Sequence, residues 1–418
     1  MTVADDPRTR AEALDAADPL ARYRDEFVVA HDWHIYLDGN SLGRLPGRTI
    51  SVLRDAVEQE WGAGLVQSWD RWVELPAATG DLIAPLIGAR PGEVIVCDQT
   101  SVNLYKLAAA AVAATGRTTI VTDDTNFPSD RYVMDGVARA AGGTLRVAQV
   151  DQVDGPQPAD IAALLDDDVA LVALSHVGYR SAAIADMAAI TALAHRHGAM
   201  ALWDLSHSAG AVPVELEASG ADLAVGCTYK HLNGGPGAPA FLYVRSSHQE
   251  NLSQPIHGWF GHDDMFAFEP SYRPAPGIAH FAVGTPPVVS LHAVAPGVAI
   301  VAEAGIQAIR AKANLLTSLL VELFDEFLAP VGFGLGSPRE AERRGGHVTL
   351  LHPEAFRLSW LARVNGVIVD FRVPDAIRLG VAPLYTRFVE VADAAFKLAV
   401  FAKHGLWRGL PAERPTVT

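Results

Sequence analysis

Two short apolar runs, each followed by a charged residue, most constrain how this chain can fold. One run covers residues 200–203 and leads into Asp204; the other covers 223–229 and leads into Lys230, 26 positions after the aspartate. Both runs are too short for helices and are bounded by turn residues, which is typical of buried strands. The stretch between them is long enough for a crossover. In one parallel sheet, such strands would bring Asp204 and Lys230 into the same crevice at the carboxyl ends of the strands.

The surrounding pattern predicts the fold class. Strand-like and helix-like stretches alternate from about residue 98 to residue 244, which favours an α/β fold with a mostly parallel sheet. The predicted strands are 118–121, 169–174, 200–203, 222–228 and 240–244, with a helical period over 187–197. Polar or aromatic clusters follow four of them, at 126–130, 175–176, 204–207 and 229–230. Because right-handed crossovers align the ends of parallel strands, these clusters predict a site along one rim of the sheet.

The pattern of predicted helices and strands changes after the Pro-Pro pair at 286–287. A long helical pattern at 306–328, strands at 347–351 and 366–371, and a last helix at 389–404 predict a smaller carboxyl-terminal α+β domain. We expect three units along the chain. They are an amino-terminal segment (1–50) that packs on the small domain or on a partner subunit, a large domain (51–295), and the small domain (296–418).

Composition excludes several classes of protein. The 418 residues carry a net charge of −15, which argues against binding to nucleic acid, because phosphates require a basic face. The two cysteines, Cys97 and Cys227, lie in or beside apolar runs, which fits a reducing cytoplasm without disulfides or zinc sites. The first 24 residues are polar and mixed in charge, unlike a signal peptide, and no apolar stretch approaches the roughly 20 residues of a membrane span. We expect a cytoplasmic enzyme.

A buried acid and a buried amine in one crevice suit pyridoxal phosphate (PLP). The amine of Lys230 would bind the cofactor covalently, and the carboxylate of Asp204 would keep the pyridine nitrogen protonated. Either residue alone is more often part of a structural ion pair. His207 and the glycine-rich turn at 234–237 favour the cofactor interpretation.

Two other segments admit two interpretations each. Thr100 and Ser101 precede a helical stretch, where hydroxyls and free N–H groups form either an anion site for a phosphate or an ordinary helix cap. Phe127 stands before Pro128, a stiff corner, and its ring could stack on a pyridine or pack in the core.

Arg378 and Trp259 also leave alternatives open. A guanidinium in an apolar strand is costly unless it is paired, and the partner of Arg378 could be a structural acid or the α-carboxylate of a substrate. The indole of Trp259 can donate to a phosphate or a carboxylate. His257 and His262 flank it, but no carboxylate or cysteine completes a ligand set, so we predict no metal site.

Seven segments together resemble the kynureninase family, and they run through most of the chain. The block from Asp204 to Lys230 alone is typical of the wider class V aminotransferase group. The sequences Gly-Asn-Ser-Leu-Gly at 39–43 and Pro-Leu-Tyr-Thr-Arg-Phe at 383–388 narrow the resemblance. The segments are 36–43, 100–104, 126–130, 203–210, 226–237, 284–287 and 383–388.

The resemblance implies the fold of aspartate-aminotransferase-type PLP enzymes and a homodimer with its sites at the interface. It implies hydrolytic cleavage of the Cβ–Cγ bond of L-kynurenine to anthranilate and L-alanine, a step of tryptophan catabolism in the kynurenine pathway towards NAD biosynthesis. The alternatives are a class V aminotransferase and a relative that acts on a modified kynurenine. A cysteine desulfurase is disfavoured because no cysteine follows Cys227.

The resemblance also implies residue roles. Lys230 would hold the cofactor, Tyr229 would donate a proton, and Arg378 would bind the substrate carboxylate. Thr285, where eukaryotic members tend to have Asn, looks like the bacterial type that prefers kynurenine over its 3-hydroxy form, and His231 stands where Tyr is common. The implied cofactor-binding residues are Thr100, Ser101, Phe127, Pro128, Ser129, Asp130, Ser175, Asp204, His207, Tyr229, Lys230, Trp259 and Thr285.

Overall fold

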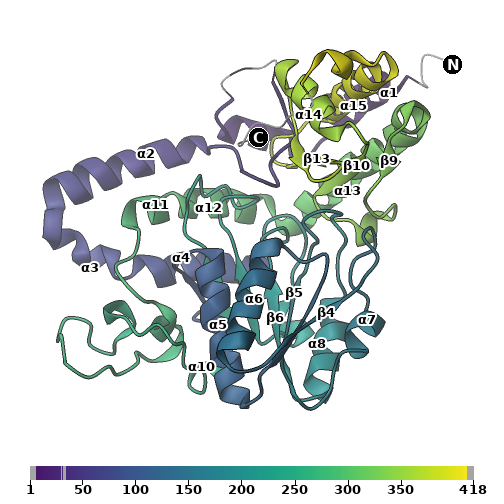
Figure 1. Cartoon of the computed structure of the whole chain (residues 1–418). Helices are drawn as coiled ribbons and strands as arrows, with labels where there is room; N and C mark the ends of the chain where they lie inside the picture. The colour runs from purple at the N-terminus through teal and green to yellow at the C-terminus, as the bar shows by residue number, and fades with distance from the viewer. Residues whose placement is uncertain (1–5, 30, 32–33, 412–418) are drawn as a thin grey trace.

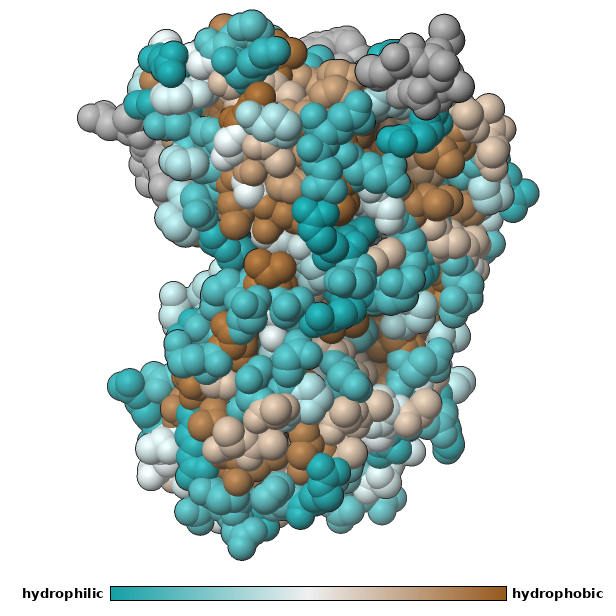
Figure 2. Space-filling view, turned by 90° about the vertical axis from the view of Figure 1, so that its right-hand side faces the viewer, coloured by the Kyte–Doolittle hydropathy of each residue, from teal (hydrophilic) through white to brown (hydrophobic). Residues whose placement is uncertain are grey.

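The computed structural model describes residues 6–29, 31 and 34–411, and these form two lobes (Figure 1). The lower lobe in that view is built on a seven-stranded sheet and the upper lobe on a four-stranded sheet. Figure 2 shows the same molecule from the side, with its outline indented between the two lobes. On this face the apolar residues form small groups among polar ones.

The large sheet has the strand order β2-β8-β7-β6-β5-β3-β4. The adjacent strands β4, β3, β5, β6 and β7 are parallel to one another, and β8 is antiparallel to both β7 and β2. This confirms the predicted α/β class with a mostly parallel sheet. The strands are β2 (Val94–Val96), β3 (Thr119–Asp123), β4 (Leu145–Ala148), β5 (Val169–Ser175), β6 (Met200–Asp204), β7 (Leu223–Gly226) and β8 (Phe241–Val244).

Both faces of the large sheet are covered, as the apolar runs of its strands require. Along β5, side chains point alternately to opposite faces, so Leu171 packs in one core cluster and Val172 in the other. Helix α5 (Thr100–Thr115) supplies Leu104 and Leu107 to the first cluster, and α8 (Met187–Arg196) supplies Ile190 to the second. The two strands that the sequence analysis missed, β2 and β4, are short edge strands.

The small sheet is antiparallel, in the order β12-β13-β10-β9, and forms a separate core with α13, α14 and α15. The smaller carboxyl-terminal α+β unit is therefore confirmed, whereas the domain limits near residues 50 and 295 stay predictions. The predicted single strand at 366–371 is wrong, because the chain leaves one sheet for another at Val369. Its two parts, β11 and β12, pair with β1 and β13 respectively. The strands are β1 (Ile35–Tyr36), β9 (Gly334–Leu335), β10 (His347–Leu351), β11 (Val367–Ile368), β12 (Asp370–Arg372) and β13 (Ala376–Gly380).

The helices carry the chain between and around these sheets. Helix α1 packs against α15, beside the small sheet, and α2 packs against α11 and α12 (Figure 1). Among the described residues no single helix is long and apolar enough to cross a membrane, while one pair, 288–304 with 306–331, bent by 81°, passes that test jointly. The remaining helices are α1 (Pro7–Ala16), α2 (Gly47–Asp55), α3 (Trp69–Trp72), α4 (Leu75–Ile83), α6 (Pro128–Ala140), α7 (Pro158–Ala162), α9 (Leu216–Ser219), α10 (Ser246–Gln249), α11 (Val288–His292), α12 (Val294–Ala304), α13 (Ile306–Leu323), α14 (Ala355–Val364) and α15 (Phe388–Lys403).

Candidate active site

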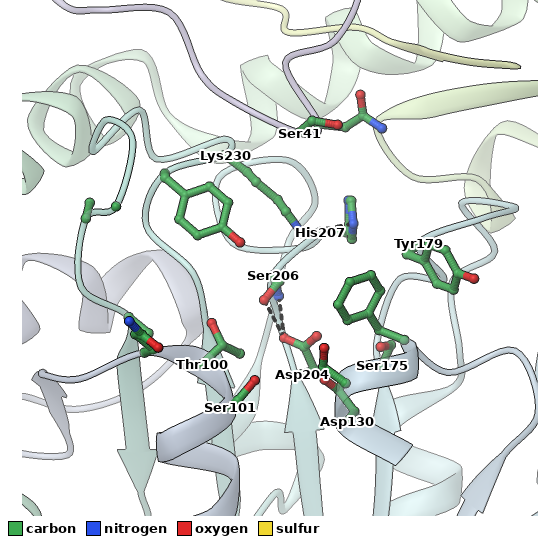
Figure 3. A pocket seen from close by; sticks show the side chains of 18 of the residues that line it. Ser41, Thr100, Ser101, Asp130, Ser175, Tyr179, Asp204, Ser206, His207 and Lys230 are labelled. Atoms are coloured by element: carbon green, nitrogen blue, oxygen red, sulfur yellow. Dashed lines mark hydrogen bonds between the residues drawn. The ribbon is translucent and has the colours of Figure 1, made fainter. Parts of the chain in front are cut away.

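A cavity of about 440 Å³ lies at the carboxyl ends of the parallel strands, against the small sheet. Strand ends, the start of α5, the turn at 40–41 and the strands β12 and β13 all contribute to its wall (Figure 3). The rim that the sequence predicted is therefore the wall of one cavity. Its lining residues are Asn40, Ser41, Gln99, Thr100, Ser101, Phe127, Ser129, Asp130, Ser175, Tyr179, Asp204, Ser206, His207, Tyr229, Lys230, Gly237, Ala238, Ala240, Arg372 and Arg378.

Asp204 and Lys230 enter this cavity from neighbouring parallel strands. Asp204 ends β6, next to Ser175 in the register, and its Oδ1 accepts hydrogen bonds from Ser206 N at 2.8 Å and Ser206 Oγ at 2.6 Å (Figure 3). Lys230 follows the end of β7, and its Nζ lies 3.1 Å from Nε2 of His207. The predicted meeting of an acid and an amine in one crevice is thus confirmed.

A second carboxyl group faces Asp204. Asp130 lies in the first turn of α6 with 3% of its surface exposed, and its Oδ2 is buried without a hydrogen-bond partner. Burial and then the negative charge of Asp204 raise the pKa of Asp130 well above its usual value. A cationic ring N–H between these two groups would supply the missing partner and relieve the repulsion, so the pair fits a protonated pyridine nitrogen.

His207 is a neutral imidazole beside the amine. Burial, followed by the positive charges of Lys230 and Arg378, lowers its pKa well below the usual value. Nε2 can therefore accept a hydrogen bond from Nζ of Lys230, and Nδ1 is buried without a partner. An uncharged ring in contact with the amine stabilises an orientation of Lys230 without adding a second cation.

The start of α5 forms the end of the cavity that suits an anion. Gln99 precedes the helix without a side-chain cap bond, so the first-turn N–H groups stay available to a ligand, and Gln99, Thr100 and Ser101 all line the cavity. Both interpretations of this segment predicted a helix start, which is confirmed. The arrangement could hold the phosphate of PLP while Lys230 reaches its aldehyde carbon.

Phe127 also lines the cavity. The residue is 38% exposed, and its ring makes a T-shaped contact with the ring of Tyr179, with ring centroids 5.2 Å apart. This is too open for a core residue and leaves a ring face for a planar ligand. Pro128, the first residue of α6, does not line the cavity, and it serves instead to start the helix.

Arg378 is held by protein groups on all three of its nitrogens. Nε donates to Asp370 Oδ2 at 2.6 Å, Nη1 to the Tyr179 carbonyl at 2.5 Å and Nη2 to Ser41 Oγ at 3.1 Å. Of the two partners left open by the sequence, the structure places an acid, Asp370, directly across the sheet from Arg378. The cavity still reaches this guanidinium, so a substrate carboxylate could share it.

Tyr229 is kept in its protonated form. The nearby Cys227 sulfur, followed by burial, raises the pKa of its hydroxyl. Its ring also lies beside the amine of Lys230, with Nζ 6.0 Å from the ring centroid. Tyr229 therefore keeps its hydroxyl proton at neutral pH, beside the reactive amine.

Trp259 and Thr285 do not line the cavity of their own chain. Trp259 packs against Trp69 and Phe266, with ring centroids 5.7 and 5.8 Å away, and Thr285 is exposed. The neighbouring surface is unusually apolar. Trp61, Val66 and Phe268, in the segments before α3 and after α10, are 60%, 75% and 76% exposed.

Sequence reasoning missed several lining residues. Arg372 places a second guanidinium in the wall, with Nε 2.9 Å from Asp370 Oδ2. Asn40 and Ser41 come from the amino-terminal segment, and Tyr179 comes from the loop after β5. The sequence feature that could have pointed to Arg372 is its spacing from Asp370. The two residues are two positions apart on one strand, so their side chains lie on the same face of the sheet. Among the described residues no group of three or more His, Cys, Asp or Glu could hold a metal ion.

Comparison with known proteins identifies the family. The chain is 44% identical to a kynureninase from Pseudomonas fluorescens over 404 residues, covering 94% of this chain and 95% of that protein. The chain belongs to the kynureninase family. A kynureninase from Burkholderia pseudomallei (strain K96243) is 42% identical over 96% of this chain and 97% of its own length. The kynureninase C-terminal domain model matches residues 309–398, which cover β10, β13 and Arg378.

Solved structures place the kynureninase fold in a wider group. The apo structure of a cysteine desulfurase from Thermococcus onnurineus NA1 matches with a TM-score of 0.77 and 19% identity over 93% of this chain and 98% of its own. A C-DES mutant with glycine covalently linked to its PLP cofactor matches with a TM-score of 0.78 and 18% identity, over 90% and 98%. The predicted PLP-dependent transferase-like fold is thereby confirmed.

Proposed function

We propose that this protein uses pyridoxal phosphate to cleave L-kynurenine hydrolytically into anthranilate and L-alanine. Full-length identity of 44% to a kynureninase carries the proposal. The cavity supports it, because it combines an amine, two facing carboxyl groups and a guanidinium within one wall. PLP, when bound, supplies an electron-withdrawing ring that stabilises negative charge at the substrate carbons next to the amino nitrogen.

The side chains divide the work of binding and proton transfer. Lys230 would hold the cofactor and, once the substrate amine replaces it, would remove the Cα proton with its free amine. Asp204 and Asp130 would hold the pyridine N–H at the base of the cavity. His207, neutral and 3.1 Å from Nζ, would orient the amine for that transfer.

Tyr229 would complete the reaction. Addition of water to the γ-carbonyl and breakage of the Cβ–Cγ bond leave the oxygen of water in the new carboxylate of anthranilate. The carbon Cβ then needs a proton to become the methyl group of alanine. Tyr229 is the protonated group beside Lys230, so we assign this donation to it.

The decisive test is anthranilate release without a second substrate. Purified holoenzyme incubated with L-kynurenine alone is expected to form anthranilate and L-alanine in equal amounts, measured by anthranilate fluorescence and amino-acid analysis. A class V aminotransferase shares the same cofactor residues but needs a keto-acid acceptor. Product formation only after addition of pyruvate or 2-oxoglutarate would contradict the proposal. Comparing kcat/KM for kynurenine and 3-hydroxykynurenine then tests the predicted preference for the first.

We also infer a homodimer in which Trp259 and Thr285 complete the cavity of the partner subunit. Two observations support this inference. Both residues lie outside the cavity of their own chain, and Trp61, Val66 and Phe268 leave large apolar groups exposed nearby. Apolar surface of this kind marks interfaces. An isologous dimer would bury it twice.

Mixed dimers test the inference. Lys230→Ala and Trp259→Ala are each expected to be nearly inactive alone. When the two are coexpressed or refolded together, half of the dimers are mixed and each mixed dimer has one intact site, so activity should recover to about one quarter of wild type. If Trp259 acts in its own chain, every site of a mixed dimer carries a lesion. Absence of recovery, in mixtures shown to exchange subunits, would therefore contradict the shared site.

A further inference from the structure

Asn40 is a buried amide with no hydrogen-bond partner. None of its surface is exposed, and neither Oδ1 nor Nδ2 forms a hydrogen bond within the described residues. An unsatisfied buried polar group costs about 1–3 kcal/mol, so such groups are uncommon without a purpose. Asn40 also lines the candidate active site. A ligand in that cavity is the natural source of the missing partner.

The position of Asn40 is fixed by the small sheet. The turn that contains it docks on the end of β13, where Gly380 N donates to the Leu37 carbonyl at 2.8 Å and Asp38 pairs with Gly380. A Cβ atom on Gly380 would lie 1.9 Å from Oδ1 of Asn40. Glycine at this position therefore leaves the space that the amide occupies.

The same geometry sets Asn40 beside Arg378. Gly380 and Arg378 are two residues apart on β13, so they face the same side of the sheet. Ser41, the next residue after Asn40, accepts a hydrogen bond from Nη2 of Arg378 at 3.1 Å. The Ser41 hydroxyl thus occupies a position on the Arg378 guanidinium that one oxygen of a substrate carboxylate would take. We expect the amide of Asn40, the preceding residue, to bind the other carboxylate oxygen.

The charges around Arg378 favour a neutral donor. Arg378 and Arg372 face two acids, Asp370 and Asp38, and burial raises the pKa of Asp38 to about 6 despite its hydrogen bond to Ser41. The cations are therefore largely compensated before a substrate arrives. An amide N–H₂ adds hydrogen-bond donors without charge, which strengthens binding of an anion and needs no further counter-ion.

We propose that Asn40 binds the α-carboxylate of the substrate together with Arg378, through its Nδ2 hydrogens. Asn40 is thus a specificity residue for α-amino acids. The identity of the substrate rests on the proposed function, but the carboxylate contact applies to any α-amino acid that enters this cavity. The probes are accordingly L-alanine and L-alaninamide, which differ only at the group in question.

The test measures dissociation constants on the PLP-loaded protein, from the change in its visible absorption on titration with each probe. Asn40→Ala is expected to raise the dissociation constant of L-alanine by about tenfold or more, because its carboxylate loses a partner. The dissociation constant of L-alaninamide, which has no carboxylate, should change by less than about twofold. Asn40→Asp should raise the dissociation constant of L-alanine further, because the new negative charge repels the carboxylate, and should leave that of L-alaninamide unchanged. The exposed Asn251→Ala is the matched control and should leave both constants unchanged.

A second variant guards against a folding defect. Gly380→Ala keeps Asn40 but displaces its amide, and it should reproduce the selective loss of L-alanine affinity with cofactor content retained. Unchanged L-alanine affinity in Asn40→Ala, or equal weakening of both probes, would overturn the proposal. Neither result depends on anthranilate formation, so a failure of the proposed function is seen separately, in the kynurenine assay.

Discussion

Replacement of Lys230 by alanine is expected to abolish turnover, with a loss of about 10⁴-fold or more, because one amine provides both the covalent link and the proton transfer. His207, the group that contacts Nζ, is buried and has a strongly lowered pKa, so it cannot take over as a base of comparable strength. The measurements are steady-state anthranilate release and the visible absorption of the covalent lysine–cofactor link, which should disappear.

The control is Lys403→Ala, which removes an exposed lysine at the end of α15 and should retain full activity. Added PLP should still bind Lys230→Ala without the covalent link, because the anion site at the start of α5 is intact. A Lys230→Ala protein that kept more than a few per cent of wild-type turnover would remove Lys230 from its assigned role. Loss of turnover with the visible absorption unchanged would do the same.

The second large effect is expected at Asp204. Asp204→Asn keeps the shape of the side chain and the neighbouring Ser206, but an amide cannot compensate a protonated pyridine nitrogen. We expect kcat to fall by about 10²–10³-fold, since that charge is what lets the ring accept electrons. Asp130 would then lose the carboxylate that helps to raise its pKa, although burial, the larger cause, would remain.

Asp130→Asn distinguishes the two carboxyl groups. The pKa of Asp130 is raised, which favours its protonated form, and an amide is close in shape to that form, so the loss should be smaller than for Asp204→Asn. Asp264→Asn, at an exposed position, serves as the control. Cofactor affinity and kcat are measured on all three variants. Near wild-type kcat in Asp204→Asn would contradict the assignment, and a larger loss in Asp130→Asn would exchange the two roles.

The sequence predicted the centre of this site because strand periodicity determines it. One apolar run of strand length ends in Asp204, and a second one leads to Lys230. The simplest arrangement of these two runs is side by side in a parallel sheet. The start of α5 and the corner at Phe127 follow strands in the same way. Strand β8, in contrast, was predicted by its composition, but its antiparallel direction depends on the long connection before it, which carries no local signal.

The rest of the site depends on contacts between distant parts of the chain. Asn40 and Arg372 are 332 positions apart and line the same cavity because the turn at 38–41 docks on β13. Neither residue lies in a pattern that predicts such a contact. Strand β4 was missed for a different reason: three of its four residues are only partly buried, so its apolar period is weak. The roles that we propose for Trp259 and Thr285 involve a second subunit, which one sequence cannot place.

The pairing of β1 with β11 has a consequence for how the protein is made. Ile35 and Tyr36 pair with Val367 and Ile368, so β1 waits for a partner strand that lies 332 positions further along the chain. Until then its backbone groups stay unpaired, and the turn with Asn40 has nothing to dock on. During synthesis the large lobe can assemble early, while the turn with Asn40 reaches its docked position only after β11 and β13 have been made.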